Sequence, residues 1–159
     1  MITALRFLMM LSLAAWLGGI VFFGAVMAPA LFSTLPSRHL AGSVVTRTLA
    51  SLHMMGLVCG VLFLGASALH NYLVRGAAQL ISTAHVLIVL MLLLTVISQF
   101  AIAPRMATLR ADMGVIDEVA PDDARRIEFN RLHVWSTRLE MGVLLLGLGT
   151  LWFVARRMS

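Results

Sequence analysis

Long apolar runs separated by short polar segments dominate this chain. Charged residues are missing from three stretches, which lie between Arg6 and Arg38, between Arg47 and Arg75, and between Arg75 and Arg105. A helix needs about 20 apolar residues to cross a bilayer core of about 30 Å, so each stretch is long enough to span a membrane. The pattern predicts an integral membrane protein.

A fourth apolar run lies between Glu140 and Arg156 and is shorter than the other three. A helix that crosses there and ends at Arg156 and Arg157 must begin before Glu140 to be long enough. Arg138 and Glu140 are therefore expected at or inside the membrane boundary. The predicted spans cover residues 5–32, 49–74, 78–103 and 133–155.

The connections between these spans differ in length. Residues 33–50 are expected to form a loop that leads into a partly amphipathic helical entry. A short link around Arg75 and Gly76 makes the second and third spans antiparallel neighbours. Pro104 is expected to stop the third span, which leaves residues 105–131 as a polar loop.

The four runs together predict an all-α fold, an up-down-up-down four-helix bundle that forms a single transmembrane domain over residues 1–159. Gly56 and Gly60 form a GxxxG ridge in the second span, where small residues let helices pack closely. The first and third loops carry more arginine than the second loop and the termini. By the positive-inside rule these two loops are expected to be cytoplasmic, with both termini outside.

Composition supports a membrane protein and excludes other classes. Hydrophobic residues make up 60% of the chain and charged residues 12%, with a mean hydropathy of +0.96. The pI near 11.3 does not indicate a nucleic-acid partner, because no basic face with interleaved aromatic residues exists. Cys59 is the single cysteine, so a disulfide framework is excluded. The expected partner is the lipid bilayer, and a homo-oligomer or a membrane-protein partner stays open.

Candidate functional residues gather at one end of the predicted bundle. The start of the second span, the end of the third and the start of the fourth share one side of the membrane. This arrangement brings together His53, Gln99, His133 and Glu140. His133 and Glu140 are spaced to fall on one stripe of the fourth helix. An ionisable group at membrane depth is costly unless it is paired or hydrated, so Glu140 is the best single candidate.

These residue types point to cofactor or metal chemistry. His53 and His133 could reach across the bundle to one haem iron, or could join Glu140 around a divalent metal ion. Glu140 and Gln99 would then support the ligands, because a hydrogen bond to the second ring nitrogen fixes the tautomer of a ligating histidine. The 11 methionines add soft sulfur that suits copper(I).

Plainer interpretations stand beside these hypotheses. The histidines could bond backbone or polar partners between helices, and the methionines could simply fill the core. Glu140 could form an interfacial ion pair with Arg138 or Arg105. His70 and His85, at the other end of the bundle, are close enough to helix ends for water to satisfy them, and a second site there is the minority interpretation.

Three segments resemble the bacterial members of the transmembrane protein 205-like family: WLGGIVFFGAVMAPALF (16–32), SQFAIAPRM (98–106) and FNRLHVWSTRLEMGVLLLG (129–147). The resemblance covers essentially the whole chain and implies a four-span protein of the bacterial inner membrane. The family is distantly similar to the copper-resistance protein D-like membrane bundles, which by analogy implies haem b or copper. The chain has no lysine, and no histidine in the first span, so ligands of those kinds cannot be carried over.

The sequence therefore favours a bundle that binds haem b or a transition metal near one membrane face. One alternative is a transporter or permeation subunit for a metal or small solute, with Glu140, His133 and Arg138 along the path. Another is a structural or assembly partner of a second membrane protein. No pair of nucleophile and base is recognisable, so an enzyme activity would require a bound cofactor.

Overall fold

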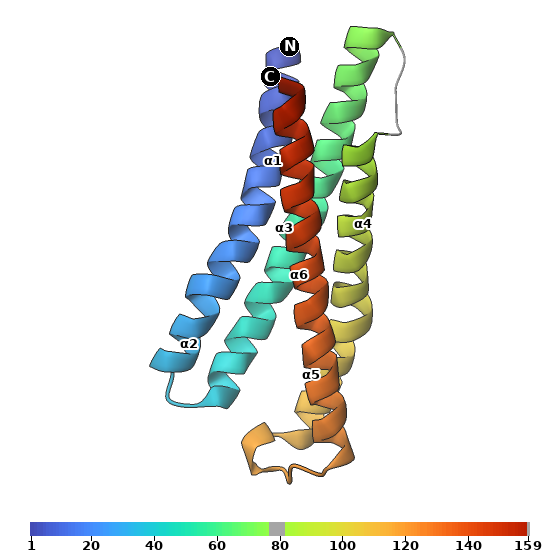
Figure 1. The fold of residues 1–159 in the computed structure, drawn as a ribbon. Coiled ribbons are helices and arrows are strands. Elements are labelled where there is room, and N and C mark those ends of the chain that lie inside the picture. Colours follow the sequence, from blue (N-terminus) through green and yellow to red (C-terminus); the bar gives the residue numbers. More distant parts are fainter. Residues whose placement is uncertain (77–81, 159) are drawn as a thin grey trace.

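The computed structural model describes residues 1–76 and 82–158, and these residues form an all-α bundle. Four helical segments are long and apolar enough to cross a membrane: Ile2–Thr34, Arg38–Val74, Thr83–Met113 and Ala124–Arg156. They alternate in direction, with both termini at one end of the bundle (Figure 1). The predicted all-α, four-helix class is confirmed, and the chain is a multi-pass integral membrane protein.

The first and third segments are each built from two α-helices joined by a π-helical segment. The first contains α1 (Ile2–Phe22), η1 (Phe23–Met27) and α2 (Ala28–Thr34), and the third contains α4 (Thr83–Ile97), η2 (Ser98–Ile102) and α5 (Ala103–Met113). The second segment is α3 (Arg38–Arg75) and the fourth is α6 (Ala124–Met158), preceded by the short 3₁₀ helix η3 (Ile116–Glu118). Around the bundle, α1 packs on α3, α3 on α4, and α4 on α6.

Pro29 and Pro104 lie inside helical segments and do not end them. Each is the second residue of an α-helix that directly follows a π-helical segment. A proline lacks the N–H of the regular ladder and its ring clashes with the preceding turn, whereas a local π turn can satisfy the freed backbone groups. The prediction that Pro104 stops the third span is therefore wrong, because the helix continues to Met113.

The two predicted polar loops are largely helical. Only residues 35–37 separate α2 from α3, and the Ser37 hydroxyl caps α3 by accepting from the Leu40 N–H at 3.1 Å. Of the predicted loop at 105–131, only residues 114–123 lie between α5 and α6. Hydropathy marks the part of a helix that lipid surrounds, whereas caps and glycine decide where the helix ends. The predicted start of the third span at residue 78 lies outside the described residues.

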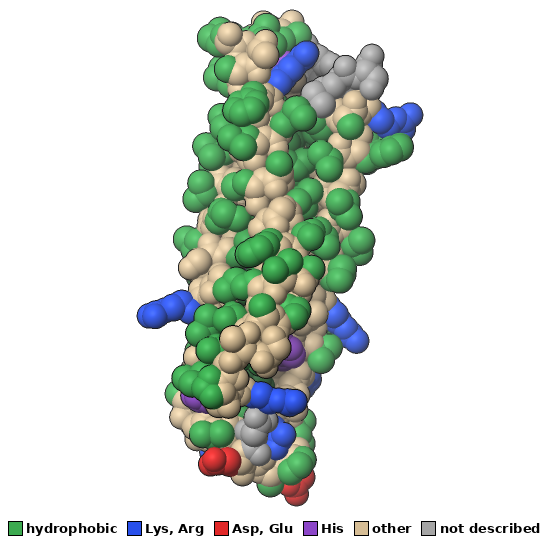
Figure 2. All heavy atoms as spheres, turned by 90° about the vertical axis from the view of Figure 1, so that its left-hand side faces the viewer, with side chains coloured by type: hydrophobic (Ala, Val, Ile, Leu, Met, Phe, Trp, Pro, Cys, Tyr) green, Lys and Arg blue, Asp and Glu red, His purple; other side chains and the backbone are tan. Residues whose placement is uncertain are grey.

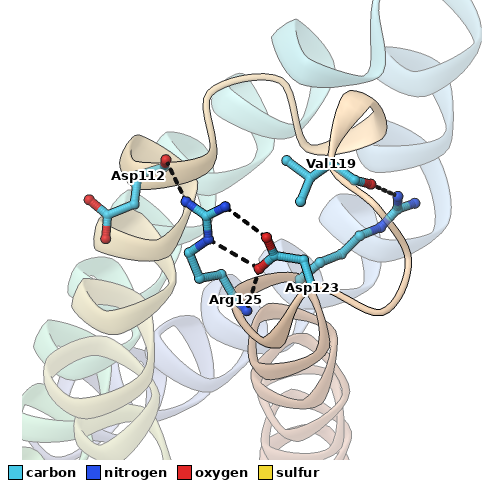
Figure 3. Close-up of polar contacts among 5 residues, drawn as sticks. Asp112, Val119, Asp123 and Arg125 are labelled. Atoms are coloured by element: carbon cyan, nitrogen blue, oxygen red, sulfur yellow. Dashed lines mark hydrogen bonds and ion pairs between the residues drawn. The ribbon is translucent and has the colours of Figure 1, made fainter.

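Two arginines tie the α5–α6 loop to the start of α6 (Figure 3). The Arg125 backbone N–H donates to Asp123 Oδ1 at 2.8 Å, which makes Asp123 the cap of α6. The Arg125 guanidinium donates to both Asp123 oxygens, at 3.1 and 2.7 Å, and to the Asp112 carbonyl at 3.3 Å. Arg126 donates to the Val119 carbonyl. The bonds from Arg125 lower the pKa of the Asp123 carboxyl to about 2, so it is ionised at neutral pH.

The core is centred on Trp16 of α1, which is 2% exposed. A Cβ at Gly56 would overlap the Trp16 indole, and a Cβ at Gly60 would lie 2.6 Å from Leu92 Cδ2. The predicted packing role of this glycine ridge is confirmed. Outside the core the bundle presents hydrophobic side chains, and charged ones gather toward its ends (Figure 2). Such a surface fits contact with a lipid bilayer.

Candidate functional site

Three polar side chains from three helical segments meet inside the bundle. His53 of α3 is 2% exposed. Its Nδ1 lies 2.9 Å from Oε1 of Gln99 in η2, and its Nε2 lies 3.1 Å from Oε2 of Glu140 in α6. We call this group the His53 triad. It joins three of the four spanning segments through one imidazole ring.

The acceptors around His53 determine where its protons lie. With the Gln99 amide oxygen assigned toward the ring, this oxygen accepts and His53 Nδ1 donates its proton. His53 Nε2 then faces a carboxyl oxygen at 3.1 Å, and two lone pairs cannot face each other at this distance without a proton or cation between them. Either an imidazolium donates to the Glu140 carboxylate, or a protonated Glu140 donates to neutral imidazole. In both cases the pair shares one proton and is neutral overall.

The position of Gln99 depends on the π-helical segment η2. A π turn holds more residues than an α turn, so it changes which residues face the bundle, and such turns are frequent at functional sites. Ser98 in the same segment is 2% exposed, and its hydroxyl has no hydrogen-bond partner among the described residues. The sequence carries no signal for η2 beyond the proline that follows it.

The His53 triad lies near one boundary of the hydrocarbon core. Glu140 precedes Arg156 by 16 residues (156 − 140), which is about 24 Å along a helix that rises about 1.5 Å per residue. With Arg156 at one interface, Glu140 is still inside a core of about 30 Å. The Arg138 guanidinium lies over the Trp135 ring at 5.5 Å, an arginine–aromatic pair of the kind found at membrane interfaces.

His133 is not part of this group. It precedes Glu140 by seven residues on α6, which is about 10 Å along the axis, and its side chain is exposed. The structure thus brings together His53, Gln99 and Glu140 from the predicted site and leaves His133 apart. Both ring nitrogens of His53 have partners in this arrangement, Gln99 and Glu140.

The two arginines predicted as alternative partners of Glu140, Arg105 and Arg138, contact other residues. Arg105 donates to both oxygens of Glu128, at 2.8 and 3.0 Å, and Arg138 stacks on an aromatic ring. Glu140 instead contacts His53, with Oε2 3.1 Å from Nε2. A sequence offers no means of choosing among these partners, because the choice depends on how the helices are rotated.

His70 and His85, at the other end of the bundle, each contact another side chain. His70 Nε2 accepts from Arg6 Nε at 3.1 Å, and His85 Nδ1 lies 2.6 Å from the Ser82 hydroxyl. Within residues 1–76 and 82–158, no three His, Cys, Asp or Glu side chains lie close enough together to hold a metal ion. In the described part of the chain, neither end of the bundle therefore provides three such ligands for one metal ion.

The comparisons with known proteins give one match. A family model described as "Domain of unknown function (DUF4149)" matches residues 11–114. The match includes His53 and Gln99, whereas Glu140 lies beyond it. No curated protein and no solved structure matches the chain.

Proposed function

Because the chain belongs to the DUF4149 family, whose function is unknown, we propose a function from its buried polar group: a proton-coupled transporter or permeation subunit. In this proposal the His53–Glu140 pair binds and releases the coupling proton. The observation that carries the proposal is the 3.1 Å contact between His53 Nε2 and Glu140 Oε2 in the interior of the bundle. Paired ionisable groups at membrane depth are characteristic of proton relays.

Release of the shared proton has a structural consequence. It leaves His53 Nε2 without a proton and facing the Glu140 carboxylate. The pair then carries a net negative charge in a poorly hydrated position. The deprotonated pair is stabilised either by a cation that takes the place of the proton or by a movement that separates α3 from α6. Proton release is thereby coupled to cation entry or to a change in helix packing, which is the requirement for coupled transport.

A divalent transition-metal ion is the cargo that the pair fits best. Gln99 fixes the Nδ1–H tautomer and directs the other ring nitrogen toward Glu140, as a supporting residue does for a ligating histidine. A nitrogen and an oxygen about 2.1 Å from one ion can lie close to the observed 3.1 Å apart. Two protein ligands hold an ion weakly, which suits passage rather than permanent binding.

Other predictions for this chain are less well supported by the geometry. Haem b or a resident copper ion, implied by the resemblance to transmembrane protein 205-like and copper-resistance D-like proteins, stays a prediction. The engaged ring nitrogens of His53 favour a shared proton over haem ligation. Location in a bacterial inner membrane also stays a prediction. Four helices enclose little space, so we expect an oligomer or a membrane-protein partner to complete the path.

The proposal is tested with the full chain reconstituted into liposomes that hold a pH-sensitive dye. A zinc or manganese gradient is expected to drive opposite proton movement in the wild type, and Glu140→Gln is expected to abolish it. Glu128→Gln is the matched control, because Glu128 lies on the same helix and pairs with Arg105. Proton movement that is absent from the wild type, or equal in Glu140→Gln and the wild type, would contradict the transport function.

A further inference from the structure

A cavity of about 470 Å³ lies between the start of α3, helix α5 and helix α6. Its polar lining comes from His39, Ser43, Thr46 and Arg110, and Met106 and Phe129 are among its apolar residues. None of the four polar residues belongs to the His53 triad. The sequence predicts no role for Arg110 or His39, whereas both line this cavity.

Arg110 is held in place in the cavity, and no carboxylate among the described residues pairs with it. Its Nη1 donates to the Thr46 hydroxyl at 3.1 Å, and its Cζ lies 5.4 Å from the centre of the Phe129 ring. Gly42 permits the close approach, because a Cβ there would lie 3.1 Å from Nη2. The ion pairs of the described residues do not include Arg110. A half-buried guanidinium is therefore positioned with most of its N–H donors unused.

His39 is a second polar side chain that lines the same cavity. Its Nδ1 is buried and has no hydrogen-bond partner among the described residues. This nitrogen is not accessible to a ligand, so a hydrogen bond from His39 to a ligand comes from Nε2. Arg110 and His39 together call for an anion with several oxygen acceptors that point in different directions.

The depth of the cavity in the membrane indicates which kind of anion it binds. Thr46 precedes His53 by seven residues, about 10 Å along the helix, in the direction away from the membrane centre. Because the His53 triad lies near the hydrocarbon boundary, the cavity lies at the depth of lipid headgroups. Phosphate is the anionic group found at that depth, and a guanidinium recognises it with paired N–H donors.

We propose that Arg110 and His39 form a binding site for a phosphate group, carried either by a phospholipid headgroup or by free phosphate. Thr46 positions Arg110, because its hydroxyl donates to the Gly42 carbonyl at 2.8 Å and accepts from Arg110 Nη1. The positively charged guanidinium balances the ligand charge, and the apolar wall at Met106 and Phe129 accommodates the glycerol backbone of a lipid. The site does not depend on the proposed transport function. It would serve equally in a transporter or in a structural partner.

The full chain in a neutral detergent is tested for binding of phosphatidylglycerol by native mass spectrometry and of inorganic phosphate by ³¹P NMR. Arg110→Gln is expected to weaken binding about tenfold, which corresponds to the loss of about 1.4 kcal/mol from a charged hydrogen bond. Arg47→Gln is the control, because it removes the same charge from an exposed position on α3. His39→Gln is a second variant that keeps Arg110 and its packing.

Each outcome of this experiment decides the proposal. Binding of the lipid alone identifies a headgroup site, and binding of inorganic phosphate identifies a site for free phosphate. The proposal is overturned if neither ligand binds the wild type, or if Arg47→Gln weakens binding as much as Arg110→Gln and His39→Gln. It is also overturned if oleate binds as tightly as the phosphate ligands, because the site would then select a carboxylate.

Discussion

Replacing Glu140 by leucine is expected to destabilise the bundle by about 1–3 kcal/mol, because His53 Nε2 is left buried without a partner. Glu140→Gln is expected to cost much less, since its amide N–H can donate to the same ring nitrogen. The difference between the two variants separates the hydrogen bond from the charge. Equilibrium unfolding in mild detergent measures it.

A double variant completes this comparison. His53→Phe combined with Glu140→Leu removes both partners and leaves no unsatisfied ring nitrogen, so we expect it to be more stable than Glu140→Leu alone. The non-additivity of the two changes reports the coupling between the side chains. Leucine and glutamine variants of equal stability, or strictly additive effects, would show that the 3.1 Å contact does not stabilise the fold.

The second large effect is expected at Gly56, where α3 passes the Trp16 indole. Gly56→Ala is expected to destabilise the protein by about 1–3 kcal/mol, because the added methyl overlaps a buried ring that has no free space to move into. Gly65→Ala is the matched control on the same helix, since nothing lies within 4 Å of a Cβ there. Thermal unfolding of the two variants provides the measurement.

The comparison of Gly56→Ala with Gly65→Ala tests whether packing against Trp16 determines the effect on stability. Alanine is the better helix former by about 1 kcal/mol, so Gly65→Ala is expected to be neutral or slightly stabilising. Equal changes at Gly56 and Gly65 would mean that helix propensity rather than packing against Trp16 sets the stability. A destabilised Gly65→Ala would contradict the account as well.

The number and order of the spanning segments could be predicted from the sequence, because hydropathy depends on composition alone. Helix ends could not be predicted in the same way. Pro104 and the charged residues that follow it predicted the end of a span, yet α5 continues to Met113 because η2 accommodates the proline. The cap at Ser37 likewise starts α3 well before the apolar run begins.

Only part of the candidate site could be predicted, because side-chain contacts between helices cannot be read from positions along the chain. Up-down topology places His53, Gln99 and Glu140 at one end of the bundle, and that much follows from their positions along the chain. Which of the two histidines near Glu140 contacts it depends on helix rotation and on the depth of each residue. His133 lies two turns away from Glu140 along α6, so a shared stripe of the helix does not bring the two side chains into contact. Arg110 was overlooked because its partners come from α3 and α6.

The most direct test of the shared proton is ¹⁵N NMR of the His53 ring in lipid bilayers, assigned by comparison with His53→Gln. We expect His53 Nδ1 to carry a proton throughout the pH range in which the protein is folded, because the Gln99 oxygen can only accept. The Nε2 resonance is expected to change with pH in the wild type and to lose that change in Glu140→Gln. An Nδ1 without a proton, or the same titration in both proteins, would contradict the account.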